Sequence, residues 1–305
     1  KEGFKMLTSL AFIFLAGLAA AALCQKVKLP RIIGMLAVGT ILGPYVLNLL
    51  DGSILSISSE LRQMALIIIL IKAGLTLNVS DLKRVGRPAV LMSFLPASFE
   101  ILAFFIFAPY LLCVTRIEAA VMGAVLGAVS PAVVIPRMVR LMDEGYGVDK
   151  SIPQMILAGA SCDDIFVIVL FSTFTAMAQG GRAGIMDFIN IPVSVLLGAA
   201  LGAAAGYMLG TFFETAYAGK NYIRNSTKTI IVLGVSFLLM AAETWLKGTI
   251  PVSGLLAVVS SACMLKIKCA PSVSRRLSEK FGKLWIAAEI LLFVLVGAAV
   301  DIRYT

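Results

Sequence analysis

Ten long apolar segments follow one another along this 305-residue chain, and they restrict what it can fold into. A helix needs about 20 predominantly apolar residues to cross the hydrocarbon core of a bilayer. Charged residues make up only 14% of the chain, whereas a soluble domain has about a quarter. The sequence therefore predicts an all-α integral membrane protein with helices over 6–24, 31–50, 61–78, 88–113, 117–141, 152–178, 190–213, 229–246, 249–266 and 284–300.

Basic residues alternate between the two sides of the predicted membrane. Most of them collect in alternate connections, such as 26–31, 83–87, 220–228 and 266–283. The positive-inside rule makes these connections cytoplasmic and places the N-terminus outside. The net charge of +9 thus reflects topology. No basic stretch is interleaved with aromatic residues as a nucleic-acid groove would be, so membrane lipids are the expected partners and nucleic acid is not.

The residue types available exclude several kinds of chemistry. The chain has no histidine, and its five cysteines lack a paired or metal-ligand spacing. Histidine-based zinc sites and Ser-His triads are therefore excluded. We expect no cofactor, and any proton chemistry has to use carboxylates.

Two adjacent carboxylates, Asp163 and Asp164, lie in the middle of the apolar run 152–178. One charged side chain near the centre of a bilayer costs about 2.5–3.5 kcal/mol on insertion scales. This cost favours a functional role for the pair. The alternative is a helix end at which water reaches both acids.

The preceding segment, 117–141, contains Gly123, Gly127, Ser130-Pro131 and Pro136. Proline removes a helical hydrogen bond and clashes with the preceding turn, so we expect a kinked or broken helix here. Unwound backbone at membrane depth persists only where it is buried in protein or lines a cavity. A plain proline kink that serves packing is the alternative.

A weak internal repeat runs through the chain. Gly34-Met-Leu-Ala-Val38 recurs as Gly254-Leu-Leu-Ala-Val258 at an offset of 220 residues, and the segment around Gly74 has a looser echo around Gly297. The first copies begin on the inside and the second on the outside. The repeat is therefore expected to be inverted, as in many secondary transporters. A full second copy would extend beyond residue 305, so we expect a segment of a longer protein that lacks about three helices.

Three motifs resemble the monovalent cation/proton antiporters, on the branch with paired aspartates. They are Gly127-Ala-Val-Ser-Pro-Ala-Val-Val134, Gly145-Tyr-Gly-Val148 and Ala160-Ser-Cys-Asp-Asp-Ile165. The resemblance implies an inverted-repeat fold of thirteen helices, of which about ten are present, and a homodimer. Residues 1–305 would form one transmembrane transporter domain. Within it, 61–178 would contribute most of the core part, and 6–50 and 190–266 mostly the dimerisation and scaffold parts.

The same resemblance assigns roles to individual residues. Asp164 matches the family's aspartate that binds the ion and the proton. Asp163 matches its neighbour in the same site, which in the family either shares the proton load or pairs with a basic residue. Glu100 resembles a buried acid that pairs with an arginine on a later helix. Ser130 stands before Pro131, where many relatives have aspartate. A serine can cap a helix end, but it carries no charge to neutralise the partial positive charge there.

Other charged residues are interpreted without the resemblance. Lys72 could extend its ammonium to the cytoplasmic side or form an ion pair with a core acid. Glu243, Glu289 and Asp301 lie near predicted helix ends and are expected to be solvated. The glycines at 198, 202, 206 and 210 form a stripe that allows close helix packing.

These features predict a transporter and not an enzyme. Sodium or lithium would be exchanged for protons by alternating access, with cation and proton competing for Asp164, in a bacterial inner membrane. Ser130, backbone carbonyls and water would complete the cation's ligands. A potassium efflux system or channel of the same fold is the alternative. An intramembrane aspartyl protease is a remote one, because consecutive acids point about 100° apart on one helix and cannot face each other.

Overall fold

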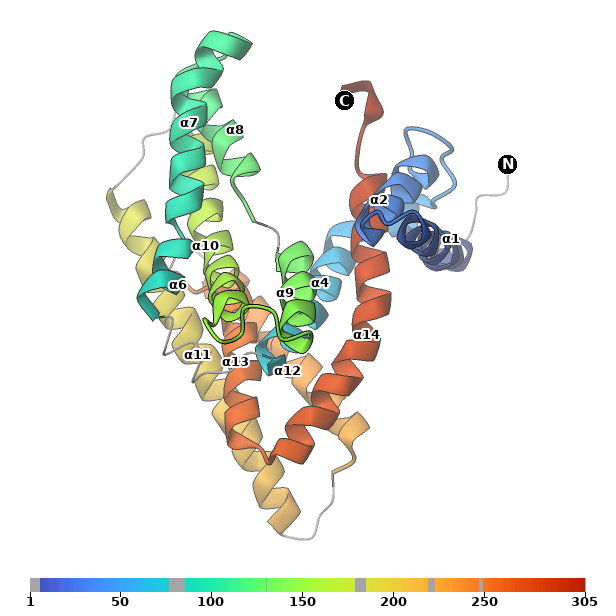
Figure 1. Cartoon of the computed structure of the whole chain (residues 1–305), viewed down its shortest axis with the longest axis vertical. Coiled ribbons are helices and arrows are strands. Elements are labelled where there is room, and N and C mark those ends of the chain that lie inside the picture. The colour runs from blue at the N-terminus through green and yellow to red at the C-terminus, as the bar shows by residue number, and fades with distance from the viewer. Residues whose placement is uncertain are drawn as a thin grey trace. The chain divides into compact units, whose positions relative to one another are not determined.

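The computed structural model describes residues 6–76, 86–129, 131–178, 185–218, 223–246 and 249–304. All ten predicted segments fall on helices, and the described residues contain no strand. The elements are α1 (Met6–Lys26), α2 (Arg31–Leu42), α3 (Gly52–Ser56), α4 (Ser58–Thr76), α6 (Gly86–Met92), α7 (Leu95–Leu112), α8 (Arg116–Leu126), α9 (Pro131–Asp143), α10 (Ile152–Ala178), α11 (Ile185–Ala218), α12 (Asn225–Leu246), α13 (Gly254–Lys268), α14 (Pro271–Ala298) and a 3₁₀ turn, η1 (Ile302–Tyr304) (Figure 1).

Two helix boundaries differ most from the prediction. Helix α2 ends at Leu42, because Pro44 disfavours helical backbone at Gly43, which is extended with φ −66° and ψ 172°. Helix α14 begins at Pro271, well before the predicted start at residue 284. Its basic first half, 275–283, is therefore helical and is not a loop.

The longer α14 also corrects the prediction that Glu289 is solvated. Glu289 lies within α14, its side chain is only 12% exposed, and its carboxylate is 3.7 Å from the guanidinium of Arg31. Glu243 is exposed, as expected, but it accepts a hydrogen bond of 2.9 Å from the N–H of Gly254 at the start of α13. Asp301 forms an ion pair of 2.8 Å with Arg303.

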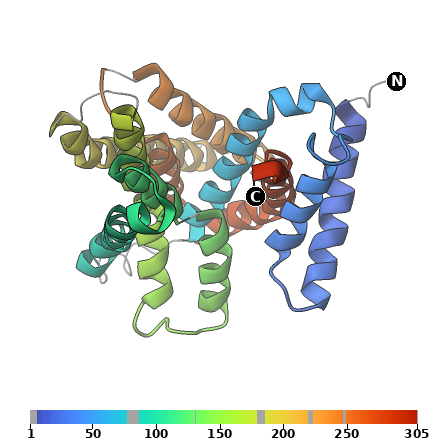
Figure 2. The ribbon, with the colours of Figure 1, turned by 90° about the horizontal axis from the view of Figure 1, so that it is seen from above.

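The chain divides into two compact units. The first comprises residues Lys1–Lys72 and Ser278–Thr305. Within it, α1 and α2 lie side by side (Figure 2). Helices α2 and α14 approach at backbone distance, since a Cβ on Gly39 would lie 2.0 Å from the carbonyl oxygen of Val294. The hydroxyl of Thr40 donates a hydrogen bond of 3.1 Å to the carbonyl of Gly297 at the same crossing.

The second unit comprises residues Ala73–Leu277 and is built on the close packing of α11 against α13. The glycine stripe of α11 faces α13 at every step. A Cβ would lie 2.6 Å from Ser253 O at Gly198, 2.1 Å from Ala257 O at Gly202 and 2.2 Å from Ser261 O at Gly206. The predicted packing role of these glycines is thus confirmed.

The two units contain equivalent helix crossings, which supports the inverted repeat. In the first unit, α14 crosses α2, and a Cβ on Gly297 would lie 2.2 Å from Leu36 O. In the second unit, the end of α4 crosses α13, and a Cβ on Gly74 would lie 2.5 Å from Val259 O. Residues of α2 and α13 match at the repeat offset of 220, as Gly39 and Val259 do, and Gly297 is the counterpart of Gly74. Helix α4 of the first copy therefore packs on α13 of the second copy, and α14 of the second copy packs on α2 of the first.

By length and composition, five stretches of the described residues can cross a membrane: Met6–Lys26, Gly86–Leu112, Val193–Tyr217, Asn225–Leu246 and Pro271–Ala298. Some of the other predicted spans are shorter or interrupted. Helix α2 has 12 residues, α13 has 15, and the segment 117–141 is divided between α8 and α9. Helix α10 reaches 27 residues. These helices establish an integral membrane protein. The assignment of 61–178, 6–50 and 190–266 to core and scaffold parts stays a prediction.

Candidate functional site

The predicted break in the segment 117–141 lies between Leu126 and Pro131. Helix α8 begins with a capping box, in which Thr115 and Glu118 satisfy each other's backbone N–H groups. It ends at Leu126, where the N–H of Gly127 still bonds the carbonyl of Gly123. Helix α9 begins at Pro131 and continues through Pro136. The break is therefore associated with Pro131 and not with Pro136, because a proline disfavours helical backbone in the residue before it.

Asp163 of α10 lies directly beside this break. Its side chain is 2% exposed, and its Oδ2 accepts a hydrogen bond of 3.1 Å from the backbone N–H of Val129. Residues between two helices leave backbone amides without helical partners, and a carboxylate is a strong acceptor for them. The sequence predicted that Asp163 and the broken helix belong to one site, but it gave no sign of this hydrogen bond.

Asp164 follows Asp163 within α10, so it occupies a position about 100° further round the helix axis. Asp163 is therefore hydrogen-bonded to the backbone at the break, and Asp164 belongs to a different face of the same helix. The side chain of Asp164 lies outside the described part of the structure, as do Ser130 and the side chains of Pro131 and Pro136. Their roles in ion binding stay predictions.

Glu100 of α7 is brought to the same region. A Cβ on Gly127 would lie 3.6 Å from the Cβ of Glu100, and the carboxylates of Glu100 and Asp163 are close enough to interact electrostatically. Glu100 is exposed in this structure, whereas the resemblance implied a buried acid. Its pairing with an arginine stays a prediction.

Lys72 of α4 lies in the first unit and is half-buried. Its ammonium donates a hydrogen bond of 2.6 Å to the hydroxyl of Ser278 on α14. The structure thus gives Lys72 a hydroxyl partner in its own unit. An ion pair between Lys72 and a core acid stays a prediction.

Helices α7, α8 and α10 form the apolar support of the site and run alongside one another in Figure 1. Five buried residues make the centre of this support: Ala97, Ile101, Ala124, Val167 and Leu170. Gly123 allows α7 and α8 to touch, since a Cβ there would lie 2.8 Å from the Cα of Ile101. The rings of Phe94 and Phe166 meet edge to face at 6.2 Å. This packing fixes the position of α10 relative to the break.

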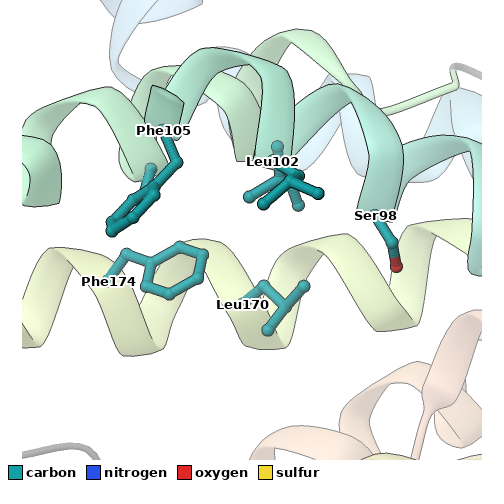
Figure 3. A pocket seen from close by; sticks show the side chains of 7 residues that line it. Ser98, Leu102, Phe105, Leu170 and Phe174 are labelled. Atoms are coloured by element: carbon teal, nitrogen blue, oxygen red, sulfur yellow. The ribbon is translucent and has the colours of Figure 1, made fainter. Parts of the chain in front are cut away.

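An apolar hollow of about 280 Å³ lies beside this support. Leu102 and Phe105 of α7 face Leu170 and Phe174 of α10 across it (Figure 3). Its one hydroxyl among the lining side chains belongs to Ser98, which donates to the carbonyl of Phe94 at 2.7 Å. Such a lining offers no ligand to a cation, so the hollow is not the ion site.

The hydrogen bond between Asp163 and Val129 makes a testable contribution to stability. Replacing Asp163 with leucine leaves the Val129 N–H without its acceptor, which we expect to cost about 1–3 kcal/mol. Replacing it with asparagine keeps a carbonyl acceptor and is expected to preserve most of that stability. The thermal midpoint of the purified complete protein would be compared between these two uncharged variants. Equal midpoints would show that this hydrogen bond does not hold the break.

Taken together, a broken membrane helix, a buried carboxylate bound to its backbone and an inverted repeat define a secondary-transporter class of membrane protein. Comparison with known proteins agrees. Residues 10–304 match the family described as "Sodium/hydrogen exchanger, transmembrane". The chain therefore belongs to the sodium/hydrogen exchanger family. This membership confirms the resemblance found in the sequence.

Individual relatives are consistent with this assignment. The chain is 33% identical to human sodium/hydrogen exchanger 9B2 over 245 residues, which is 80% of this chain and 44% of the relative. It is 30% identical to human sodium/hydrogen exchanger 9B1 over 310 residues, covering 97% of this chain and 58% of the relative. The chain thus spans about half the length of the curated relatives it matches.

A solved structure shows the same fold. The sodium/proton antiporter MjNhaP1 of Methanocaldococcus jannaschii superposes with a TM-score of 0.77, covering 98% of this chain and 71% of the antiporter. The two sequences are only 19% identical, so this likeness concerns the fold alone.

Proposed function

We propose that the complete protein exchanges sodium or lithium for protons across a membrane by alternating access, with cation and proton competing for Asp164. The observation that carries this proposal is the contact of Asp163 with the break between α8 and α9. Asp164 is the next residue along α10, about 100° further round the helix axis, and the proposal assigns it to the same region of the membrane as the break. The names of the 9B2, 9B1 and MjNhaP1 relatives, which describe sodium/hydrogen exchange or sodium/proton antiport, support the same function.

The proposed chemistry follows from the ligands available. Sodium and lithium are hard cations that prefer oxygen ligands, which a carboxylate, a serine hydroxyl and free backbone carbonyls can supply. A single carboxylate can hold either a proton or a cation. If the site reorients only when it is occupied, transport of one species requires return of the other. Reorientation would come from the core moving against the scaffold, in a homodimer.

A proteoliposome experiment tests this function. The complete protein is reconstituted, a proton gradient is imposed, and internal pH is followed after addition of sodium, lithium or potassium. We expect sodium or lithium to collapse the proton gradient. We also expect no cation current that is uncoupled from proton movement. Potassium conductance without proton movement would instead favour the channel or efflux system. No response to any of the cations in a folded protein would contradict the proposal.

The proposed topology has the N-terminus outside the cell. The accessibility of two cysteines to a labelling reagent can test this orientation. Cys113 is exposed at the end of α7 and Cys269 is 5% exposed between α13 and α14. Burial, with a smaller contribution from the Glu214 carboxylate, raises the pKa of the Cys269 thiol to about 11. Cys269 is therefore neutral at pH 8, and its reaction with maleimides is expected to accelerate only as the pH rises toward that pKa.

Single-cysteine variants in intact cells check this expectation. A membrane-impermeant maleimide should label Cys113 from outside at pH 7–8, and should label Cys269 only after denaturation. Labelling of Cys113 that requires permeabilised cells would reverse the proposed orientation. A plasma membrane of the bacterial type stays the predicted location.

A further inference from the structure

Most of the Asp, Gln, Ser and Thr residues of α10 lie on one side of the helix, and Asp163 and Thr173 are the exceptions. Five of them, Gln154, Ser161, Asp164, Ser172 and Thr175, follow at spacings of seven, three, eight and three residues. Helix α10 is continuous over all five, and a rotation of about 100° per residue places them within an arc of about 80°. These five positions are called the polar stripe below.

The opposite side of α10 has a different composition. Val167 and Leu170 belong to the apolar centre packed against α7 and α8, and both lie about 100° or more from the middle of the polar stripe. Asp163 lies with them, bonded to the helix break. Helix α10 thus has a packing side that includes Asp163 and a polar side that includes the position of Asp164.

The polar stripe is as long as a membrane is thick. Gln154 and Thr175 are separated by 21 residues, which is about 31 Å of helix against about 30 Å of hydrocarbon. Asp164 lies near the middle, ten residues from one end and eleven from the other. A local packing role for a single polar side chain would not explain five polar positions aligned over this length.

At the two ends of the stripe the structure buries polar groups, although Thr175 as a whole is only half-buried. Gln154 is only 4% exposed. The hydroxyl oxygen of Thr175 is buried and, within the described residues, has no hydrogen-bond partner. A helical threonine can ordinarily bond the carbonyl four residues earlier, and leaving a buried hydroxyl unpaired is costly. Polar groups at such positions in membrane helices face the bundle interior or a water-filled cavity.

We propose that the polar stripe is one wall of the path by which cations and protons reach Asp164, with Gln154 lining it on one side of the membrane and Thr175 on the other. This inference rests on the proposed exchange function. The amide oxygen of Gln154 and the hydroxyl of Thr175 replace part of the hydration shell of a small monovalent cation as it moves along the helix. They position the transported ion and take no part in binding it at the central carboxylate.

Exchange kinetics give the first test. In the complete protein, Thr175→Val and Gln154→Leu are each expected to raise the apparent KM for sodium by about threefold to tenfold, the effect of losing one hydrogen-bonding ligand. The matched control is Thr173→Val, because Thr173 is buried on the same helix but lies about 160° from Thr175 round the axis. This control should leave the KM unchanged. An increase of equal size in the control and the stripe variants would overturn the inference.

Accessibility gives a second readout that does not depend on transport. In a cysteine-free background, Thr175→Cys and Gln154→Cys should react with a small charged methanethiosulfonate reagent from opposite sides of the membrane, and sodium should slow both reactions. Val167→Cys, on the packing side, should stay unreactive. Failure of both stripe cysteines to react would overturn the path, even in a protein that exchanges sodium for protons. Reaction of both would support it, even if the parent protein showed no exchange.

Discussion

Replacing Asp164 with asparagine is expected to abolish cation-dependent proton movement in proteoliposomes that contain the complete protein. Asparagine has nearly the same shape as aspartate, but it can neither take up a proton nor neutralise a cation. Interactions with a charged group contribute about 1.5–3 kcal/mol each, so losing the charge should weaken cation binding by about tenfold to a hundredfold. Losing the group that carries the proton should remove the coupled proton movement.

The measurement needs two controls. Glu144→Gln removes a carboxylate that pairs with Arg140 at 2.6 Å on an exposed surface, and it should exchange like the parent protein. The elution profile and thermal midpoint of Asp164→Asn should match those of the parent, because the hydrogen bond from Val129 to Asp163 is left intact. Unchanged exchange in a folded Asp164→Asn variant would rule out competition at this carboxylate.

Replacing Gly202 with valine is expected to prevent stable folding. A Cβ at Gly202 would lie 2.1 Å from the carbonyl oxygen of Ala257, which is backbone and cannot move away as a side chain could. Gly198, Gly202 and Gly206 keep α11 in backbone contact with the segment 253–261 over about 12 Å of helix, so one branched side chain separates the helices along this contact. Overpacking costs about 1–3 kcal/mol in ordinary cores, and this site should exceed that range.

Gly234 of α12 provides the matched control, because a Cβ there would meet nothing within 4 Å. The thermal midpoint of Gly202→Val should fall by about 10 °C or more, or the monodisperse elution peak should be lost, whereas Gly234→Val should change the midpoint by only a few degrees. Similar losses in both variants would mean that the valine's helix propensity, and not the contact with α13, is responsible.

The sequence was sufficient for the features that depend on local chemistry. The lengths of the apolar runs predicted a helix in each of the ten segments. A single segment within a membrane can satisfy its own backbone hydrogen bonds only as a helix. The prolines at 131 and 136 predicted a kink or break in the segment 117–141, and the structure placed the break at Pro131. The glycine spacing on α11 predicted a packing face. Asp163 and Asp164 were recognised because charges are costly in an apolar run. In the same way, the spacing of polar residues along α10 was already present in the sequence.

Only the tertiary structure decided which of these local features meet. It placed the Asp163 carboxylate on the Val129 N–H, paired Arg31 with Glu289, and crossed α14 over α2 and α4 over α13 at equivalent glycines. Each of these contacts joins residues far apart in the chain, where periodicity and propensity carry no information. The sequence by itself therefore determined which segments are helical and where their charges lie, whereas several helix ends and breaks were decided by the structure. The packing of those helices decided that Asp163 holds the break, while Asp164 occupies another face of the same helix.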